Sequence, residues 1–422
     1  MTSPPGRALV VVLGRGSPSP ARIVRAAGDR PVVFACGADA IPASTVALAE
    51  SLAPVVPVPA GLPLGAVPAL ATHRPAGITT FSEPALPVTQ VLADALGLPY
   101  HSASTVTALT DKSCQRARLA AAGVDATRSA TVRGRAELDA ALTGPPFVVK
   151  PLRGEGSIDT YLARTPDDVP AGLAVGPERP FLVEEFLAGR DERPFGDYVS
   201  VETLTASGHT HVLGVTGKLA LLPPFREVGQ FAPSRLGSDE DWAVAGLAVR
   251  ALAALGVTRG LAHTEIKLTP AGPRLIEVNG RLGGHIEELY GRTLGLDLLA
   301  LELAVAAGDK PVLDLRPPER VHYQYTNLPP IDGGTLLAVA GAAAVRAQPG
   351  IVSYRAMTPR GSVLPTGVAT VELDLLAGEA ADHAALLADV DAALARLRFT
   401  FADADGVSRV WQADRTGLRC LG

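Results

Sequence analysis

The chain has 422 residues, of which 47% are hydrophobic and 19% charged, and these values predict a globular protein of about two to four packed units. Its 38 lysines and arginines stand against 43 acidic residues, a net charge of -5, and the basic residues form no run interleaved with aromatic ones. This composition excludes nucleic acid as an expected partner.

The cysteines and the apolar stretches indicate in which cellular compartment the protein is expected. Cys36, Cys114 and Cys420 are far apart and odd in number, so they predict neither a disulfide framework nor a metal motif. Charged residues interrupt the longest apolar stretches before these reach the length of a membrane span, and no targeting segment is apparent. We therefore expect a cytoplasmic protein with no membrane partner.

Residues 1–100 are expected to form an open α/β unit. Alternating apolar runs and helical stretches predict strands at 7–13, 31–35 and 77–81, and helices ending at Ala27 and spanning 88–96. The loop at Gly14 and Gly16 lacks the third glycine of a dinucleotide fingerprint and is followed by Pro18, so we interpret it as a turn.

Residues 101–190 are expected to hold a linker helix and a small lid. Thr110 and Asp111 can cap a helix over 112–122. Beyond it the pattern predicts strands at 129–132, 147–150, 158–163 and 181–185 and a helix at 136–142.

A glycine loop follows the second of these strands, directly after Lys150. Its backbone N–H groups at Gly154 and Gly156 and the hydroxyl of Ser157 suit the β- and γ-phosphates of a nucleotide. A flexible hairpin loop without a ligand is the alternative interpretation.

Residues 191–311 are expected to form a larger unit with strands at 198–203 and 211–219 and a helix at 239–255. The polar, proline-rich stretch 223–233 is interpreted as a functional loop. Arg226 is a candidate for holding a substrate carboxylate bidentately, and Gln230 for lining the pocket. Hydrogen bonds that merely fix the loop are the alternative for both residues.

Residues 265–277 predict a β-hairpin around a Pro/Gly turn, and symmetry about Ala271 places Glu265 opposite Glu277. Directly opposed like charges destabilise a strand pair, so this pair calls for a cation or a held proton. The period-2 rule points Glu277, Asn279 and Arg281 to the same face. Carboxylate and amide oxygens suit Mg²⁺ or Mn²⁺, and solvated charges on an exposed hairpin are the alternative.

Three further side chains near the hairpin are candidates for the site. His263 and Lys267 alternate with Glu265 and so face the same side if the strand is regular. His263 is either a base for an incoming ammonium group or a structural histidine, and Lys267 meets phosphate or a hairpin carboxylate. His285, which precedes a predicted helix, is a candidate for the pocket wall.

Residues 312–422 are expected to form a small α+β unit. Strands are predicted at 321–326, 350–357 and 367–373, with a helix at 384–397. Nothing in this unit indicates catalysis.

The order of these motifs resembles the ATP-grasp superfamily over most of residues 75–310. The resemblance implies a mixed α/β and α+β protein with an N-terminal α/β domain, a small lid and an antiparallel-sheet domain that clamps ATP. It implies that Lys112 and Lys150 contact the nucleotide phosphates. It also implies an adenine pocket lined by Glu184, Glu185, Phe186 and Leu187, with Glu192 or Asp197 as the ribose acid.

The resemblance implies that the metal ligands are Glu265, Glu277 and Asn279. Arg281 would stabilise the transferring phosphate and the acyl intermediate, together with backbone amides at Gly283 and Gly284.

Within the superfamily, the runs 263–267 and 276–284 are similar to those of L-amino-acid ligases and carnosine-synthase-like enzymes. That similarity implies an ATP-dependent ligase that joins a small-molecule carboxylate to an amine through an acyl phosphate and releases ADP and phosphate. Alternatives are a ligase that uses a non-amino-acid carboxylate or a thiol acceptor, and a non-catalytic ATP-binding module. A homodimer through the N-terminal or C-terminal unit is also expected.

Overall fold

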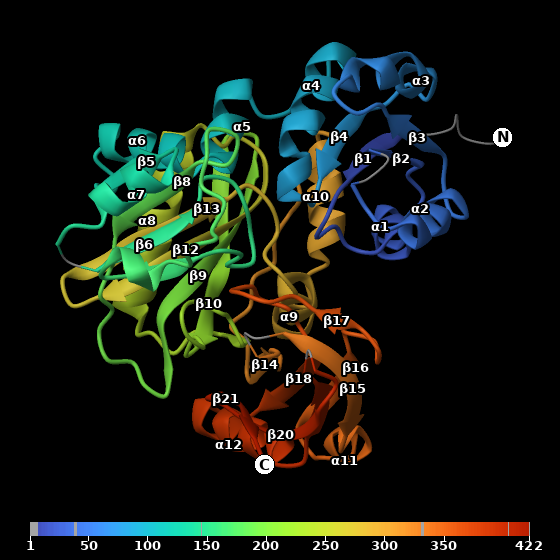
Figure 1. Cartoon of the computed structure of the whole chain (residues 1–422). Coiled ribbons are helices and arrows are strands. Elements are labelled where there is room, and N and C mark those ends of the chain that lie inside the picture. The colour runs from blue at the N-terminus through green and yellow to red at the C-terminus, as the bar shows by residue number, and fades with distance from the viewer. Residues whose placement is uncertain (1–6, 38–39, 145, 331–332, 404, 422) are drawn as a thin grey trace.

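The computed structural model describes residues 7–37, 40–144, 146–330, 333–403 and 405–421. Figure 1 shows the N-terminal region in blue at the upper right, the lid and central region in teal to yellow at the left, and the C-terminal region in orange and red below. The mixed α/β architecture with large antiparallel sheets confirms the predicted fold class.

The N-terminal region is built on a four-stranded parallel sheet with the order β3-β2-β1-β4. Its strands are buried apolar runs, as the sequence predicted, and β3, α2 and α3 are additional elements that the pattern did not indicate. The elements are β1 (Leu9–Leu13), α1 (Pro20–Ala27), β2 (Val32–Gly37), α2 (Ala43–Glu50), β3 (Val55–Val58), the 3-10 turn Pro63–Ala66, α3 (Val67–Thr72), β4 (Gly77–Thr80), the 3-10 turn Glu83–Ala85 and α4 (Leu86–Leu96).

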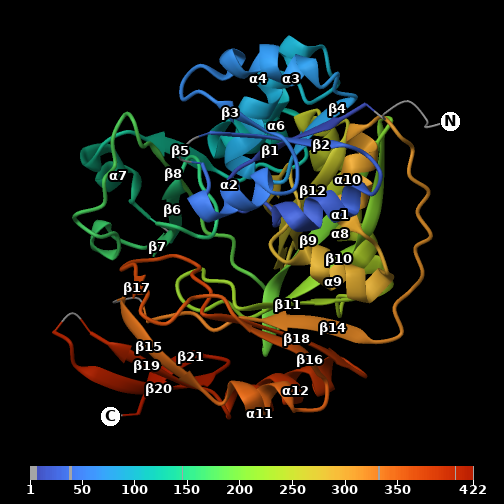
Figure 2. The same cartoon turned by 90° about the vertical axis from the view of Figure 1, so that its right-hand side faces the viewer.

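A helix from much later in the chain completes this region. Helix α10 (Leu298–Ala306) lies beside β4 and α1 in both Figure 1 and Figure 2. The approach is close, because a Cβ atom on Gly77 would lie 1.9 Å from the carbonyl oxygen of Ala306. The N-terminal sheet is therefore fastened to the central region by direct packing.

The lid is a four-stranded antiparallel sheet with the order β5-β8-β6-β7. Asp111 caps the helix before it, since its Oδ1 accepts hydrogen bonds from the backbone N–H groups of Ser113 and Cys114. The elements are α5 (Ala103–Thr110), α6 (Lys112–Ala121), β5 (Ser129–Val132), α7 (Arg135–Ala141), β6 (Phe147–Pro151), β7 (Tyr161–Ala163), the 3-10 turn Pro166–Asp168 and β8 (Phe181–Glu185).

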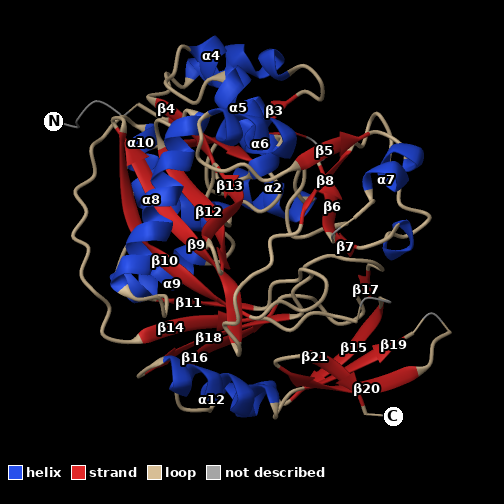
Figure 3. Cartoon of the chain, turned by 90° about the vertical axis from the view of Figure 1, so that its left-hand side faces the viewer, coloured by secondary structure: helices blue, strands red, loops and turns tan. Residues whose placement is uncertain are grey.

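The central region is an eight-stranded antiparallel sheet with the order β13-β12-β9-β10-β11-β14-β18-β16, seen in red in Figure 3. Helix α8 packs against β10 and β13, and α9 against β11 and β14. The elements are β9 (Phe195–Ala206), β10 (His209–Leu219), β11 (Gly229–Ala232), α8 (Ser238–Leu255), β12 (Gly260–Thr269), β13 (Gly272–Asn279), α9 (Ile286–Leu294), β14 (Val321–Tyr325), β16 (Ile351–Ala356) and β18 (Asp374–Ala380).

This sheet continues across position 312, because β14, β16 and β18 belong to the C-terminal region. A five-stranded sheet, β17-β15-β19-β20-β21, completes that region, and α12 packs between the two sheets on β14, β18 and β20. The remaining elements are β15 (Gly334–Ala340), α11 (Ala342–Arg346), β17 (Val363–Leu364), α12 (His383–Leu394), β19 (Arg398–Ala402), β20 (Ser408–Asp414) and β21 (Gly417–Cys420).

The predicted strand at 367–373 is wrong. These residues are irregular, and β18 begins only at Asp374. Their backbone groups bond to the lid instead of a sheet: Val368 O accepts from Asp159 N at 3.0 Å, and Thr370 N donates to Gly156 O at 2.9 Å. Val368 is itself buried in the hydrophobic core of the lid. We call residues 366–373 the clasp.

The cysteines are free thiols, as expected from their spacing. Among the described helices, none combines the length and the apolar character that a bilayer crossing requires.

Candidate active site

The β12–β13 hairpin has the register that the sequence predicts, with Glu265 directly opposite Glu277 and His263 opposite Asn279. A bulge makes this possible. Next to the turn Thr269 pairs with Gly272, but the register shifts between Glu265 and Ile266. An extra residue in β13 therefore places Glu277 directly opposite Glu265. Bulges commonly re-aim side chains beside functional sites in this way.

These carboxylates open into a cavity of about 790 Å³. The cavity is bounded by the lid, the hairpin, the N-terminal loop at residues 15–19 and the clasp residues 369–372. All four predicted units thus contribute to one site. Most of the candidate residues predicted from sequence line it, and the exceptions are Arg226, Glu192 and Asp197.

Two lysines predicted to contact phosphate are buried on the lid side of the cavity. Lys112 Nζ lies 2.7 Å from Glu277 Oε1, and Lys150 Nζ lies 2.6 Å from Glu184 Oε1. Arg116 Nε binds the other oxygen of Glu184 at 2.9 Å. Burial raises the pKa of Glu184, but Lys150 and Arg116 outweigh it and hold that pKa at about 2. The carboxylate is therefore ionised and keeps both cations in place.

Arg116 was not predicted, although it lies one helical turn after Lys112 on the same face of α6. Glu185, Phe186 and Leu187 continue from Glu184 along the cavity wall, as the predicted adenine strand requires.

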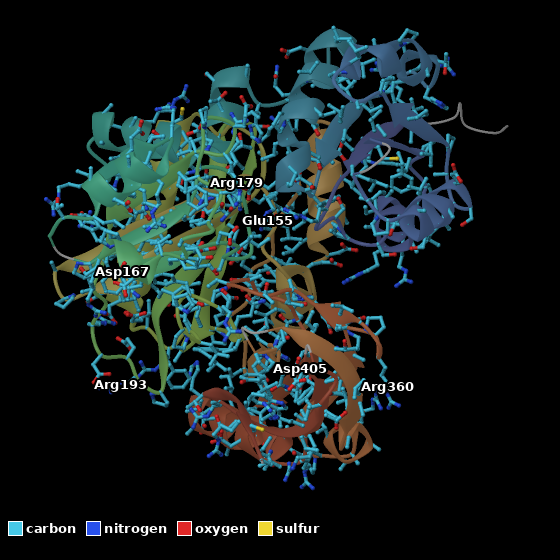
Figure 4. All side chains as sticks on the ribbon, viewed as in Figure 1. Glu155, Asp167, Arg179, Arg193, Arg360 and Asp405 are labelled. Atoms are coloured by element: carbon cyan, nitrogen blue, oxygen red, sulfur yellow. The ribbon has the colours of Figure 1, made fainter. Side chains whose placement is uncertain are left out.

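The glycine loop lines the cavity with Gly154, Gly156 and Ser157. The Ser157 hydroxyl is already engaged, because it donates to the carbonyl oxygen of Phe225 at 2.7 Å. Glu155, labelled in Figure 4, binds Arg15 of the N-terminal loop at 3.2 Å and lies 3.7 Å from Arg281. The loop is therefore tied to several regions of the molecule in this structure.

Lys218 is a functional candidate that sequence reasoning missed. Its side chain is 2% exposed, and its Nζ contacts Glu227 Oε1 at 2.9 Å and Gln230 Oε1 at 3.0 Å. The available signal was the position of Lys218 in a predicted strand, where a lysine is uncommon in the interior. Gln230 also donates to the carbonyl oxygen of Gly284 at 2.8 Å, so it links Lys218 to the glycines after β13.

His263 is held between two carboxylates. Its Nδ1 lies 2.9 Å from Glu202 Oε2, and its Nε2 lies 3.6 Å from Glu265 Oε1. Burial lowers the pKa of His263, but Glu202 more than compensates and raises it to about 9. The ring is therefore an imidazolium at neutral pH, which favours the structural role over the base role. Burial raises the pKa of Glu265, but the hydrogen bond from His263 dominates and brings it to about 2.

Arg281 reaches the cavity from just beyond β13. Its Nη1 donates to the carbonyl oxygen of Leu282 at 2.9 Å, and its Nη2 to Glu83 Oε2 at 3.3 Å. Its Nε is buried and makes no hydrogen bond to the described residues. Glu83, a buried residue of the N-terminal region that the sequence did not single out, has a pKa raised to about 7 by burial.

The structure does not bring Arg226, Glu192 or Asp197 to the cavity wall. The Arg226 guanidinium donates to the carbonyl oxygens of Pro223 and Pro329, at 3.2 and 2.9 Å, and so fixes its own loop. Glu192 pairs with Arg190 and Arg235. Asp197 Oδ1 lies 2.6 Å from Lys267 Nζ, and only Lys267 of that pair lines the cavity.

His285, which follows Gly283 and Gly284, pairs with Glu372 of the clasp. His285 Nε2 lies 2.9 Å from both carboxylate oxygens of Glu372. His285 was expected in the pocket wall, and it lies there. Glu372 was missed because residues 367–373 were interpreted as an ordinary strand.

The oxygen donors of the hairpin fit a hard divalent cation. Within the described residues, no three His, Cys, Asp or Glu side chains are grouped as a complete metal site. Two carboxylates and an amide are nevertheless the set that Mg²⁺ uses when substrate phosphates and water complete its coordination. In this structure the negative charge of Glu277 is balanced by Lys112 and that of Glu265 by His263.

No protein-family profile matches the chain. Human carnosine synthase 1 is 32% identical over 160 residues, which cover 36% of this chain and 18% of that protein. The chain therefore spans less than a fifth of the length of this curated relative.

Solved structures match over nearly the whole chain. The L-amino acid ligase from Bacillus licheniformis has a TM-score of 0.75 at 22% identity, covering 94% of this chain and 98% of that chain. A carboxyaminoimidazole ribonucleotide synthase from Aspergillus clavatus, complexed with ATP, has a TM-score of 0.70 at 16% identity, covering 92% and 97% respectively.

The chain has the ATP-grasp fold of these solved structures. The proteins that it resembles in sequence or structure include a carnosine synthase and an L-amino acid ligase.

Proposed function

We propose that the protein is an ATP-dependent carboxylate–amine ligase that forms an amide through an acyl phosphate and releases ADP and phosphate. The observation that carries this proposal is the direct opposition of Glu265 and Glu277 in a cavity that also holds Lys150, Lys218 and Arg281. Paired carboxylates surrounded by cations suit a metal–triphosphate complex, and the relatives named above support amide formation.

ATP would bind on the lid side of the cavity. Lys112, Lys150 and Lys218 are the cations available to its phosphates, and the strand from Glu184 to Leu187 would contact adenine. Glu192 and Asp197 remain predictions for the ribose, and Asp197 is the better placed because its partner Lys267 lines the cavity.

Glu265, Glu277 and Asn279 are the residues that would hold Mg²⁺ or Mn²⁺. A cation held there would neutralise negative charge on the phosphates of ATP. Lys112 would then exchange its contact with Glu277 for a contact with phosphate.

The reaction would proceed in two transfers. A carboxylate oxygen of the first substrate attacks the γ-phosphorus of ATP, and the bond to the β-phosphate oxygen breaks to release ADP. Arg281 and the backbone N–H groups of Gly283 and Gly284 would stabilise the oxyanion when the amine attacks the acyl carbon. The lid and clasp would exclude water, which otherwise hydrolyses the acyl phosphate.

Several broader expectations stay proposals. The division into residues 1–100, 101–190, 191–311 and 312–422, the homodimer and the cytoplasmic location all rest on the sequence pattern.

The test is ADP and phosphate release from Mg-ATP over a grid of amino acids, offered singly and in pairs, with mass spectrometry of each positive well. We expect release that depends on two substrates and yields their condensed product. Glu277→Ala should abolish it, and Glu319→Ala, which removes an exposed carboxylate, should not. AMP in place of ADP, or activity retained in Glu277→Ala, would contradict the proposal.

A further inference from the structure

The His285–Glu372 pair has the geometry of a proton acceptor held by an orienting carboxylate. Both oxygens of Glu372 face His285 Nε2 at 2.9 Å, and both side chains line the cavity. They are also reachable, with exposed side-chain fractions of 27% for His285 and 26% for Glu372.

Glu372 selects one form of the imidazole. An ionised carboxylate only accepts hydrogen bonds, so Nε2 must carry a hydrogen to bind it. In the neutral ring Nδ1 is then an acceptor. Nδ1 makes no hydrogen bond with any described residue, so its lone pair is available to a substrate.

The backbone at His285 supports a role beyond packing. Its φ of 57° lies in the left-handed region, where a non-glycine residue is uncommon and is held by its surroundings. Those surroundings are part of the site: Gln324 donates to the carbonyl oxygen of His285 at 3.3 Å, and Gln230 to that of Gly284.

Other titratable groups that line the cavity are already engaged. Both ring nitrogens of His263 face carboxylates, those of Glu202 and Glu265. Glu287 pairs with Arg22. Glu288 pairs with Arg292 and Arg355. Of the two histidines among the described residues of this cavity, His285 is the one with a ring nitrogen, Nδ1, that faces no carboxylate.

We propose that His285 is the catalytic base that takes a proton from the ammonium group of the amine substrate, and that Glu372 is the positioning residue that holds its tautomer. This inference rests on the proposed ligase function. It assigns the clasp end of the cavity to an acceptor that arrives as an ammonium ion, the usual state of an amino acid at neutral pH.

The protons and bonds balance as follows. His285 Nδ1 removes one proton from the ammonium group, and the free amine then attacks the acyl carbon. The new carbon–nitrogen bond replaces the carbon–oxygen bond to phosphate. The nitrogen loses its second proton to the departing phosphate, which leaves as hydrogen phosphate, and the imidazolium returns its proton to solvent.

The position of the pair fits this order of events. The clasp that carries Glu372 bonds to the glycine loop of the lid through Thr370 N and Gly156 O at 2.9 Å. Lid closure over ATP and placement of the base would therefore occur together, before the acyl phosphate forms.

Hydroxylamine separates this role from acyl phosphate formation. It is largely unprotonated at neutral pH, so it can trap an acyl phosphate as a hydroxamate without help from a base. The experiment compares ATP-dependent hydroxamate formation with amide formation, both in a mixture of the protein amino acids, for the wild type and each variant.

His285→Asn is the informative variant, because asparagine tolerates the left-handed backbone and cannot act as the base. We expect hydroxamate formation within about twofold of the wild type and amide formation lowered by about 10²–10⁴-fold, the usual contribution of a general base. The residual amide activity should rise with pH as the free amine accumulates. Glu372→Gln should show the same split more weakly, and Glu372→Asp should restore part of the loss.

The outcomes are distinguishable. Equal loss of hydroxamate and amide in a folded His285→Asn protein that still binds ADP would overturn the base role, and so would unchanged amide formation. Absence of hydroxamate from the wild type would overturn the proposed ligase function itself, and this inference with it.

Discussion

The β12–β13 hairpin and the clasp bring carboxylates into the same cavity by different means. The hairpin positions Glu265 and Glu277 through its own strand register and one bulge. Among the described residues the clasp pairs with no strand. Val368 and Thr370 bond to Asp159 and Gly156 of the lid, and the backbone at Glu372 itself is held by Thr358, whose Oγ1 donates to Glu372 O at 2.7 Å. Local structure therefore positions the carboxylates of the hairpin, whereas the position of the clasp depends on contacts between segments far apart in the chain.

The largest expected effect comes from the hairpin. Glu277→Gln keeps the size of the side chain but removes a charge that would hold the metal, and it leaves Lys112 without its partner. We expect ADP release to fall at least about 10³-fold, since metal-bound charge stabilisation is worth several kcal/mol. A coupled ADP assay over a range of Mg²⁺ concentrations measures this. A rate of ADP release above a tenth of the wild-type rate would show that the carboxylate of Glu277 does not hold the metal.

The free energy of unfolding should depend on pH through Asp374, the first residue of β18 after the clasp. Burial raises the pKa of Asp374 to about 6, although hydrogen bonds from Asn327 and Tyr354 oppose it. The folded state therefore binds this proton more tightly than the unfolded chain does, and its contribution to stability grows as pH falls from about 6 to about 4.

The Asp374 effect can be isolated with Asp374→Asn, which lacks the titrating group. Between pH 6 and 4 we expect the free energy of unfolding of the wild type to gain about 1–3 kcal/mol relative to this variant. Urea denaturation at several pH values measures the difference. A difference that is constant with pH would mean that Asp374 does not titrate in this range.

Detaching the clasp should uncouple ATP cleavage from ligation. Val368→Asp places a charge in the apolar core of the lid, which is unfavourable by several kcal/mol unless the segment moves away. We expect the ratio of phosphate released to amide formed to rise about tenfold, as water reaches the acyl phosphate. Val363→Asp, at a position that is 80% exposed in the same region, is the matched control. An equal ratio of phosphate to amide in both variants would show that the clasp does not exclude water from the acyl phosphate.

The smallest effect is expected at the contact between the glycine loop and the N-terminal region. Glu155→Gln weakens the pairs with Arg15 and Arg281, of which Arg15 is largely exposed. A partly exposed ion pair contributes about 0.5–1 kcal/mol, so the KM for ATP should rise about two- to fivefold. The effect should shrink at high salt because exposed charges are screened. A KM shift that is independent of salt would point to a lost steric contact.

The sequence alone determined the features that depend on near neighbours in the chain. Alternation in β12 and β13 and the turn between them predicted the opposition of Glu265 and Glu277. The capping residues Thr110 and Asp111 predicted the start of α6, where Asp111 makes the cap. The order of these motifs was enough to indicate the ATP-grasp fold.

Only the tertiary structure decided which partner satisfied each polar group. The Arg226 guanidinium donates to the carbonyl oxygen of Pro329 and not to the cavity. Lys218 and Glu83 are buried. Residues 367–373 bond to the lid and do not form a strand. The physical reason is that periodicity fixes the direction of a side chain relative to its own element, while a long-range hydrogen bond or ion pair depends on which distant segment packs there.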